Sequence, residues 1–86
     1  MNFRTFIQLE DILRIAFDIK GRSIKDIAHM ANIKLNTLYK WNCGAMHFSP
    51  NNIEKLLMYF QEYEPVRLMY AEKIYDAWCE IGKNKN

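Results

Sequence analysis

Residues 23–44 decide the fold of this 86-residue chain, and they read SIKDIAHMANIKLNTLYKWNCG. In the first part of the stretch, apolar side chains recur at helical spacing, at Ile24, Ile27, Ala28 and Ala31. A second set is spaced by three residues, at Leu35, Leu38 and Trp41. This periodicity predicts two short amphipathic helices. Because the connection between them is very short, the helices must cross steeply, and the small side chain of Ala28 fits the crossing point.

Capping signals mark the ends of this helix pair. Ser23 and Asp26 have the spacing of a capping box, with Asp in the place of the usual Glu. Asn32 follows the first helix, and Asn is one of the few non-glycine residues that tolerate a left-handed backbone. Lys34 opens the second helix with a side chain that cannot cap it, and Gly44 lies at its end. The stretch is therefore predicted to be a helix-turn-helix unit.

Glycine, proline and serine place the remaining helices. Residues 5–20 carry apolar side chains at helical spacing and precede Gly21, which we expect to act as a C-terminal cap. Ser49-Pro50 opens a fourth helix. Glu64-Pro65 interrupts it, because the residue before a proline avoids the helical conformation. A fifth helix is predicted over residues 65–81. No run alternates with period two, so the prediction is an all-α, compact five-helix domain.

The chain divides into two segments of unequal size. Residues 1–64 hold the helix-turn-helix domain. Residues 65–86 hold the extra C-terminal helix, which either dimerises or closes the core, and a polar tail over residues 82–86.

Composition narrows the class of protein. Lys and Arg number 12 against 10 Asp and Glu, so the net charge is only +2. Any nucleic-acid surface must therefore come from local clustering of basic residues. The two cysteines, Cys43 and Cys79, do not form a disulfide framework and indicate a reducing compartment. Cys79 is interpreted as a small buried apolar residue.

The N-terminal region does not have the apolar core of a signal peptide. It is interrupted by the polar residues Arg4, Gln8, Glu10 and Asp11. No stretch approaches the roughly 18 apolar residues that a membrane-spanning helix needs. We therefore expect a cytoplasmic protein that makes no membrane contact.

Residues for catalysis or metal binding are sparse. Glu10-Asp11 and the pair Glu62 and Glu64 are local acidic groups without a convergent partner in the sequence, and there is no Gly-x-Gly motif. Cys43 and His47 supply one pair of zinc ligands, whereas a structural site needs four. We expect neither an enzyme nor a metal, a cofactor or a small-molecule substrate.

The second helix of the pair has a polar outer side. If Leu38 and Trp41 face the core, the residues left outside are Lys34, Asn36, Thr37, Tyr39 and Lys40. The major groove of DNA admits an α-helix of this kind. A polar outer face is also what any solvated amphipathic helix presents.

The ordered set of residues resembles the Cro/lambda-repressor type (XRE-like) of helix-turn-helix DNA-binding domain over residues 5–63. The matching positions are Ala28, Ile33, Leu38, Trp41, Gly44, Pro50, Leu56, Leu57 and Phe60. The chain departs from the family's usual residues at Ile24, Asn32, Lys34 and Leu35.

The resemblance implies that the partner is double-stranded DNA. The base-reading positions then fall on Lys34, Leu35, Asn36, Thr37, Tyr39 and Lys40. The phosphate contacts fall on Arg22, Ser23, Lys25, Asn42 and Lys55. Leu35 either touches a thymine methyl group or turns inward. The function implied is a sequence-specific transcriptional regulator, a small repressor such as those of phages, plasmids or antitoxin systems. The alternative is a protein-binding or inhibitor module on the same fold.

The C-terminal helix carries its own apolar stripe. Its members are Val66, Met69, Tyr70, Ile74, Trp78 and Ile81, which we interpret as the interface of a homodimer. Arg67 is assigned to the polar side of this helix together with Glu72, Lys73, Asp76 and Glu80. The alternative is that the stripe folds back onto the rest of the chain, and we expect part of it to do so.

Overall fold

The computed structural model describes residues 4–84, with side chains up to residue 81. It contains five α-helices and no strand in this part of the chain, which confirms the all-α five-helix prediction. The helices are α1 (Phe6–Asp18), α2 (Ile24–Ala31), α3 (Leu35–Asn42), α4 (Pro50–Tyr63) and α5 (Pro65–Asn84). None of them has both the length and the apolar character that crossing a membrane requires.

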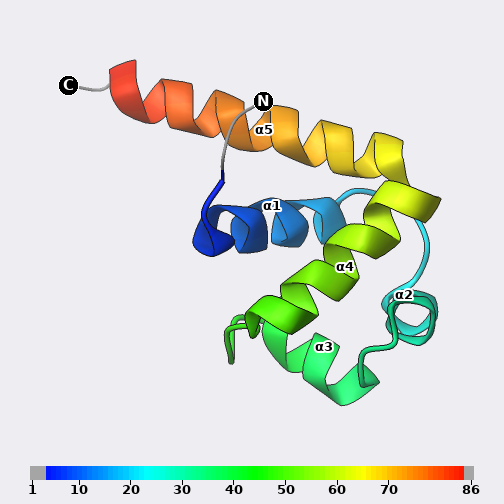
Figure 1. Cartoon of the computed structure of the whole chain (residues 1–86). Helices are drawn as coiled ribbons and strands as arrows, with labels where there is room; N and C mark the ends of the chain where they lie inside the picture. Colours follow the sequence, from blue (N-terminus) through cyan, green and yellow to red (C-terminus); the bar gives the residue numbers. More distant parts are fainter. Residues whose placement is uncertain (1–3, 85–86) are drawn as a thin grey trace.

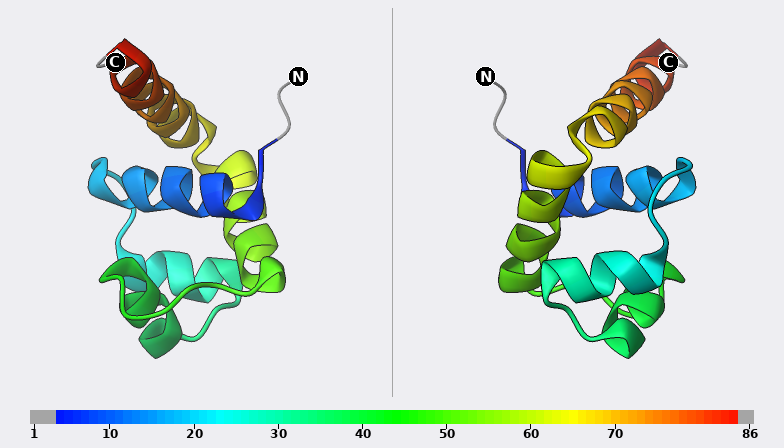
Figure 2. Two further views of the ribbon diagram at one scale, coloured as in Figure 1. Left: turned by 90° about the vertical axis from the view of Figure 1, so that its left-hand side faces the viewer. Right: turned by 90° about the vertical axis from the view of Figure 1, so that its right-hand side faces the viewer.

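The helices stack so that α3 and α5 lie at opposite ends of the molecule. Figures 1 and 2 show α1 between α5 and the α2–α3 pair, while α4 runs along one side and reaches both ends. The second half of α5 extends past the beginning of α1 (Figure 1). The surface of α3 is therefore remote from the surface of α5.

Side-chain caps fix where three of the helices begin. Ser23 and Ser49 accept hydrogen bonds from the backbone amides of Asp26 and Asn52, so α2 and α4 begin where the sequence predicts. Thr5 forms a full capping box with Gln8 at the start of α1. These bonds satisfy first-turn amides that have no partner inside the helix.

The turn between α2 and α3 depends on Asn32. Its backbone is left-handed (φ 58°, ψ 48°), as the sequence predicts. This conformation lets the Ile33 amide donate to the carbonyl of Ala28, 2.9 Å away, and places the Ile33 side chain in the core. Gly44 ends α3 in the same way with φ 84°, since the Ala45 amide donates to the Lys40 carbonyl at 2.9 Å.

One core joins all five helices. Its largest fully buried side chains are Trp41, Phe60, Ile12, Leu13, Ile27, Leu38, Ile53 and Leu56. Phe17 is half-buried and contacts the rings of both Trp41 and Phe60 edge-on, at 5.5 and 5.8 Å between centroids. Edge-on contacts of this kind add to the free energy of burying the rings.

The predicted end of α1 is wrong by two residues, and so is the predicted role of Gly21. The helix ends at Asp18 because Ile19 is extended (φ −85°, ψ 138°) and packs against the core. Gly21 does not have a positive φ. Instead, its lack of a side chain leaves room for the ends of the Glu64 and Arg67 side chains. A Cβ at this position would lie 2.6 Å from Glu64 Oε1 and 2.7 Å from Arg67 Nη1.

The inner face of α5 differs from the predicted stripe. Arg67, assigned to the polar side, is buried beside Leu68 and Ala71 against α1. Its Nε donates to the carbonyl of Ala16 at 2.7 Å, which satisfies a group in the last turn of α1. Of the predicted interface residues, Ile74 packs partly against the core. The others are exposed: Val66, Met69, Tyr70, Trp78 and Ile81.

The C-terminal part of α5 is longer and more exposed than predicted. The helix continues through Asn84, into the segment expected to be a tail, and the rest of that tail (residues 85–86) lies outside the described residues. Cys79 is exposed rather than buried, so its interpretation as a small buried apolar residue is wrong.

Candidate nucleic-acid interface

The outer face of α3 consists of three exposed polar or aromatic side chains. Leu38 and Trp41 are completely buried, so the helical period turns Asn36, Tyr39 and Lys40 to the solvent side. Tyr39 is half exposed, at 50%. An amide, a phenol and an ammonium therefore stand together on the end of the molecule opposite α5.

Three predicted base-reading residues do not lie on this outer face. Leu35 is half-buried and packs against the core, so it turns inward. Thr37 is half-buried and lines a hollow on one flank of α3. Lys34 precedes the helix and lines the same hollow, and its side chain makes no capping bond.

One flank of α3 meets the N-terminus of α2. A shallow hollow of about 330 Å³ brings together the predicted phosphate-contact residues Arg22, Ser23 and Asn42 with Tyr39. The guanidinium of Arg22 donates to Met30 Sδ and lies 5.9 Å from the ring centroid of Tyr63. Lys25 is exposed on α2 outside this hollow. The flank thus combines a helix N-terminus and basic side chains, a common arrangement for binding phosphate, with two carboxylates, Asp18 in the wall of the hollow and Asp26 in the first turn of α2.

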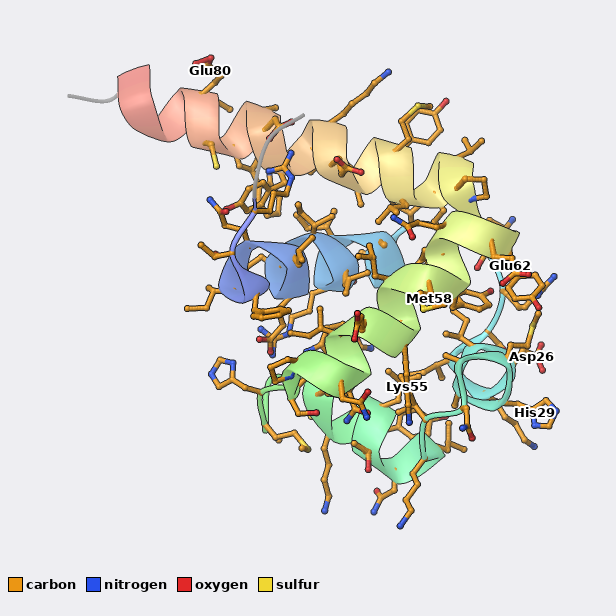
Figure 3. The ribbon with its side chains drawn as sticks, viewed as in Figure 1. Asp26, His29, Lys55, Met58, Glu62 and Glu80 are labelled. Atoms are coloured by element: carbon orange, nitrogen blue, oxygen red, sulfur yellow. The ribbon has the colours of Figure 1, made fainter. Side chains whose placement is uncertain are left out.

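The other flank of α3 meets the first turns of α4. Here a hollow of about 490 Å³ is lined by Lys34, Thr37, Asn52, Lys55 and His29, with no acidic residue in its wall. Figure 3 shows Lys55 extending from α4 toward the α2–α3 turn, and its Nζ donates to the Asn32 carbonyl at 3.3 Å. The ammonium group is held in place by this bond and keeps further N–H donors for a ligand.

Sequence reasoning missed Asn52 and His29 in this hollow. The sequence contains a signal for Asn52. A helix that begins at Pro50 places Asn52 in its first turn, and Lys55 follows one turn later on the same side of the helix. His29 has no comparable signal. It lies in the last turn of α2, beside the α2–α3 turn, and lines the hollow there.

The charge distribution favours an anionic ligand at this end. Residues 27–53 contain no Asp or Glu, although the whole chain carries ten, and they include Lys34 and Lys40. The α2–α3 turn, α3 and the beginning of α4 all lie within this acid-free segment. The surface around α3 is therefore more basic than the net charge of +2 indicates.

A buried carboxylate positions α3 from behind. Glu10 of α1 is 4% exposed and accepts from Trp41 Nε1 at 3.0 Å and from the Phe48 amide at 3.3 Å. Arg14 donates to the same oxygen at 3.2 Å, and His47 Nδ1 lies 3.1 Å from it. The prediction that Glu10 has no convergent partner is wrong. Its place on the apolar side of α1, three residues before Leu13, was the available signal.

A second network holds the loop that leads into α2. Glu64 accepts from Tyr59 Oη at 2.6 Å, from Arg67 Nη1 at 2.9 Å and from the Arg22 amide at 3.2 Å. Burial raises the pKa of Tyr59 to about 12, with the hydrogen bond to Glu64 adding to the effect. Burial acts to raise the pKa of Glu64 as well, but the bonds from Tyr59 and the Arg22 amide and the charge of Arg67 lower it overall.

The two networks give the interface a rigid support. One fixes α3 and the loop after it, and the other fixes the loop that carries Arg22 and Ser23. No family model, curated protein or solved structure matches the chain.

Proposed function

We propose that this protein is a sequence-specific DNA-binding regulator that reads the major groove with α3. The observation that carries the proposal is the outward set Asn36, Tyr39 and Lys40, flanked on both sides by hollows that contain basic residues. An α-helix fits the major groove, and side chains on its outer face then reach base edges.

The three outward residues have complementary roles in this proposal. The Asn36 amide can pair in a bidentate manner with adenine, and Lys40 can donate to the acceptors of guanine. Tyr39 presents a hydroxyl group and an apolar ring beside them. Thr37 and Lys34 contact the backbone rather than bases, because they lie in the hollow on the flank.

Phosphate groups on the two sides of the groove would occupy the two flanks of α3. Arg22, Ser23 and Asn42 serve one strand, and Lys34 and Lys55 serve the other. Such contacts fix the orientation of a protein on DNA and dominate its affinity, whereas base contacts provide the preference for sequence. A bound protein of this kind represses transcription by occupying its site.

Selection of bound duplexes from a random pool tests the proposal. At physiological salt, the wild-type chain should enrich a defined sequence. A variant with Asn36→Ala, Tyr39→Ala and Lys40→Ala should lose the preference and keep its circular dichroism spectrum, because none of the three side chains is in the core. A wild-type chain without preference above its non-specific affinity would refute the proposed function.

Single variants separate the two kinds of contact. Asn36→Ala should cost about 1–3 kcal/mol of discrimination at one base pair of a site. Lys25→Ala, on exposed α2, should instead weaken all duplexes alike and reduce the dependence of affinity on salt. If two copies bind together with two-fold symmetry, the enriched sequence should be an inverted repeat with half-sites about 34 Å apart.

A further inference from the structure

A groove lies between one face of α1 and the second half of α5, which pack against each other. Figure 2 shows α5 tilted relative to α1, so α5 does not cover the whole of this face. The α1 wall of the groove is formed by residues that recur at helical spacing and therefore share one side of the helix. They are Asp11, Arg14, Ile15 and Asp18, and the α5 wall consists of Tyr75 and Trp78.

A carboxylate stands at each end of the α1 wall. Asp11 and Asp18 are two helical turns apart, which separates them by about 10 Å along the axis. Neither forms an ion pair with another residue in the part of the chain that the structure describes. Between them lies the buried side chain of Ile15, and the α5 wall supplies the rings of Tyr75 and Trp78. The groove therefore has negative charge at both ends and apolar surface in the middle.

Arg14 does not place its charge in the groove. Its Nη2 donates to Glu10 Oε1 at 3.2 Å and to the carbonyl of Met46 at 3.4 Å, and its guanidinium carbon lies 5.3 Å from the ring centroid of Trp41. Trp41 belongs to α3 and Met46 to the loop after it, so the guanidinium is turned away from α5. What Arg14 contributes to the groove is its aliphatic stem.

The molecule already holds a cation beside Tyr75 with the same kinds of group. The guanidinium carbon of Arg4 lies 5.5 Å from the centroid of the Tyr75 ring, and its Nη2 donates to Asp76 at 3.1 Å and lies 3.7 Å from Glu72. An aromatic face attracts a cation, and carboxylates beside it add to the attraction. The groove offers this combination a second time, with Trp78 as a further ring.

The distribution of charge and apolar surface selects a class of ligand. A linear aliphatic polyamine has methylene groups between terminal ammonium groups, which matches an apolar groove with a carboxylate at each end. A lysine or arginine side chain has a single cationic end and would leave one carboxylate unpaired. A metal ion needs its oxygen ligands within about 2–3 Å, which carboxylates at opposite ends of the groove cannot supply. The volume of about 290 Å³ is near the lower end for ligand sites and suits a slender chain.

We infer that the groove between α1 and α5 binds a linear aliphatic polyamine of the length of spermidine. One terminal ammonium group pairs with Asp11 and the other with Asp18, and the chain between them lies on Ile15. The internal ammonium group of spermidine faces the rings of Tyr75 and Trp78, which is a favourable position for a cation. No residue of α3 lines the groove, so this binding does not depend on DNA and goes beyond the proposed function.

Equilibrium dialysis against radiolabelled spermidine, without DNA, tests the inference. The wild-type chain should bind spermidine saturably. Asp11→Asn and Asp18→Asn should each lower the affinity by about two- to fivefold, the effect expected of a partly exposed ion pair. Glu62→Gln is the matched control, because Glu62 is an exposed carboxylate on α4 outside the groove (Figure 3), and it should leave the affinity unchanged. Circular dichroism verifies that the three variants are folded.

The length of the ligand and the exposed indole give two further readouts. The shorter putrescine, and n-octylamine with its single ammonium group, should compete more weakly than spermidine, because neither pairs with both carboxylates. Bound spermidine should also protect Trp78, which is 61% exposed, from quenching by acrylamide. Trp41 is completely buried and should contribute little to the change.

Three results would overturn the inference. The absence of saturable binding at millimolar spermidine would show that the groove is not a polyamine site. Equal losses of affinity in Asp11→Asn, Asp18→Asn and Glu62→Gln would show a general attraction to acidic surface. A short peptide with two lysines that displaces spermidine at a lower concentration than spermidine itself requires would make a basic protein segment the better occupant. Each of these results leaves the DNA proposal standing.

Discussion

The indole Nε1 of Trp41 donates a hydrogen bond to Oε1 of Glu10, 3.0 Å away. This bond joins the inner face of α3 to the middle of α1, and both side chains are buried. Phe48 stacks on the indole with 4.4 Å between ring centroids, and its amide donates to the same carboxylate. The orientation of α3 and the path of the loop after it are therefore set by one acidic residue on another helix.

We expect Glu10→Ala to lower the free energy of unfolding by about 2–4 kcal/mol, because it leaves the indole and amide N–H groups buried without an acceptor. Asp11→Ala is the matched control. It removes an adjacent, less buried carboxylate and should change stability by about 0.5 kcal/mol or less. Urea denaturation followed by tryptophan fluorescence measures both. Equal effects of the two substitutions would show that the contacts of Glu10 do not stabilise the fold.

Gly21→Ala should destabilise the protein by about 1–2 kcal/mol, although Gly21 does not adopt a glycine-specific conformation. The new Cβ displaces the ends of Glu64 and Arg67, and the bonds that hold them have to shift. The effect should be smaller in a chain that already carries Glu64→Ala, because one displaced group is then absent. Thermal unfolding of the wild-type chain, the two single variants and the double variant gives this coupling directly. If the effects of Gly21→Ala and Glu64→Ala are strictly additive, the strain that Gly21→Ala causes does not involve Glu64.

Stability should fall in alkali as Tyr59 ionises. Its pKa is raised from 10.0 to about 12 in the folded chain, so its contribution is fully present below about pH 10. Between pH 10 and 12 the unfolded chain loses the proton first, and that contribution is lost. Tyr59→Phe should abolish this part of the pH dependence. The urea denaturation midpoints of the wild-type and Tyr59→Phe chains, measured across this pH range, test the prediction. If the two midpoints fall in parallel as the pH rises, the loss of stability does not come from Tyr59.

Lys55→Met should weaken the binding of every duplex and lower the slope of log affinity against log salt by about 1, because it removes one phosphate contact. Lys55→Arg retains the charge at the same position and should preserve most of the slope. Fluorescence anisotropy titrations at several salt concentrations provide the measurement. If Lys55→Met keeps the wild-type slope, the hollow between α3 and α4 does not hold a phosphate.

Local signals in the sequence were sufficient to place most of the helices. Ser23, Asn32 and Ser49-Pro50 act through atoms of their own turn, so their roles can be predicted without knowing what packs nearby. The period of Leu38 and Trp41 likewise determines which side of α3 faces outward. On this basis the orientation of Asn36, Tyr39 and Lys40 was predictable.

The roles of Glu10, Arg67 and Gly21 depend on partners that are distant in the sequence. Glu10 bonds to Trp41, 31 residues away, and Arg67 bonds to Ala16, 51 residues away. A charged residue within an apolar pattern is buried only when other elements supply its hydrogen bonds, and the sequence does not state which elements these are. The same holds for Thr37 and Leu35, whose exposure depends on how α4 and α2 pack beside α3.

The two tryptophans lie in opposite environments, and this makes the chain its own optical reporter. Trp41 is completely buried and stacked on Phe48, whereas Trp78 is 61% exposed on α5. Emission from the first should be blue-shifted and shielded from soluble quenchers, and emission from the second should be red-shifted and accessible to them. A change confined to the red component reports an event on α5, and a change in the blue component reports the loss of the core.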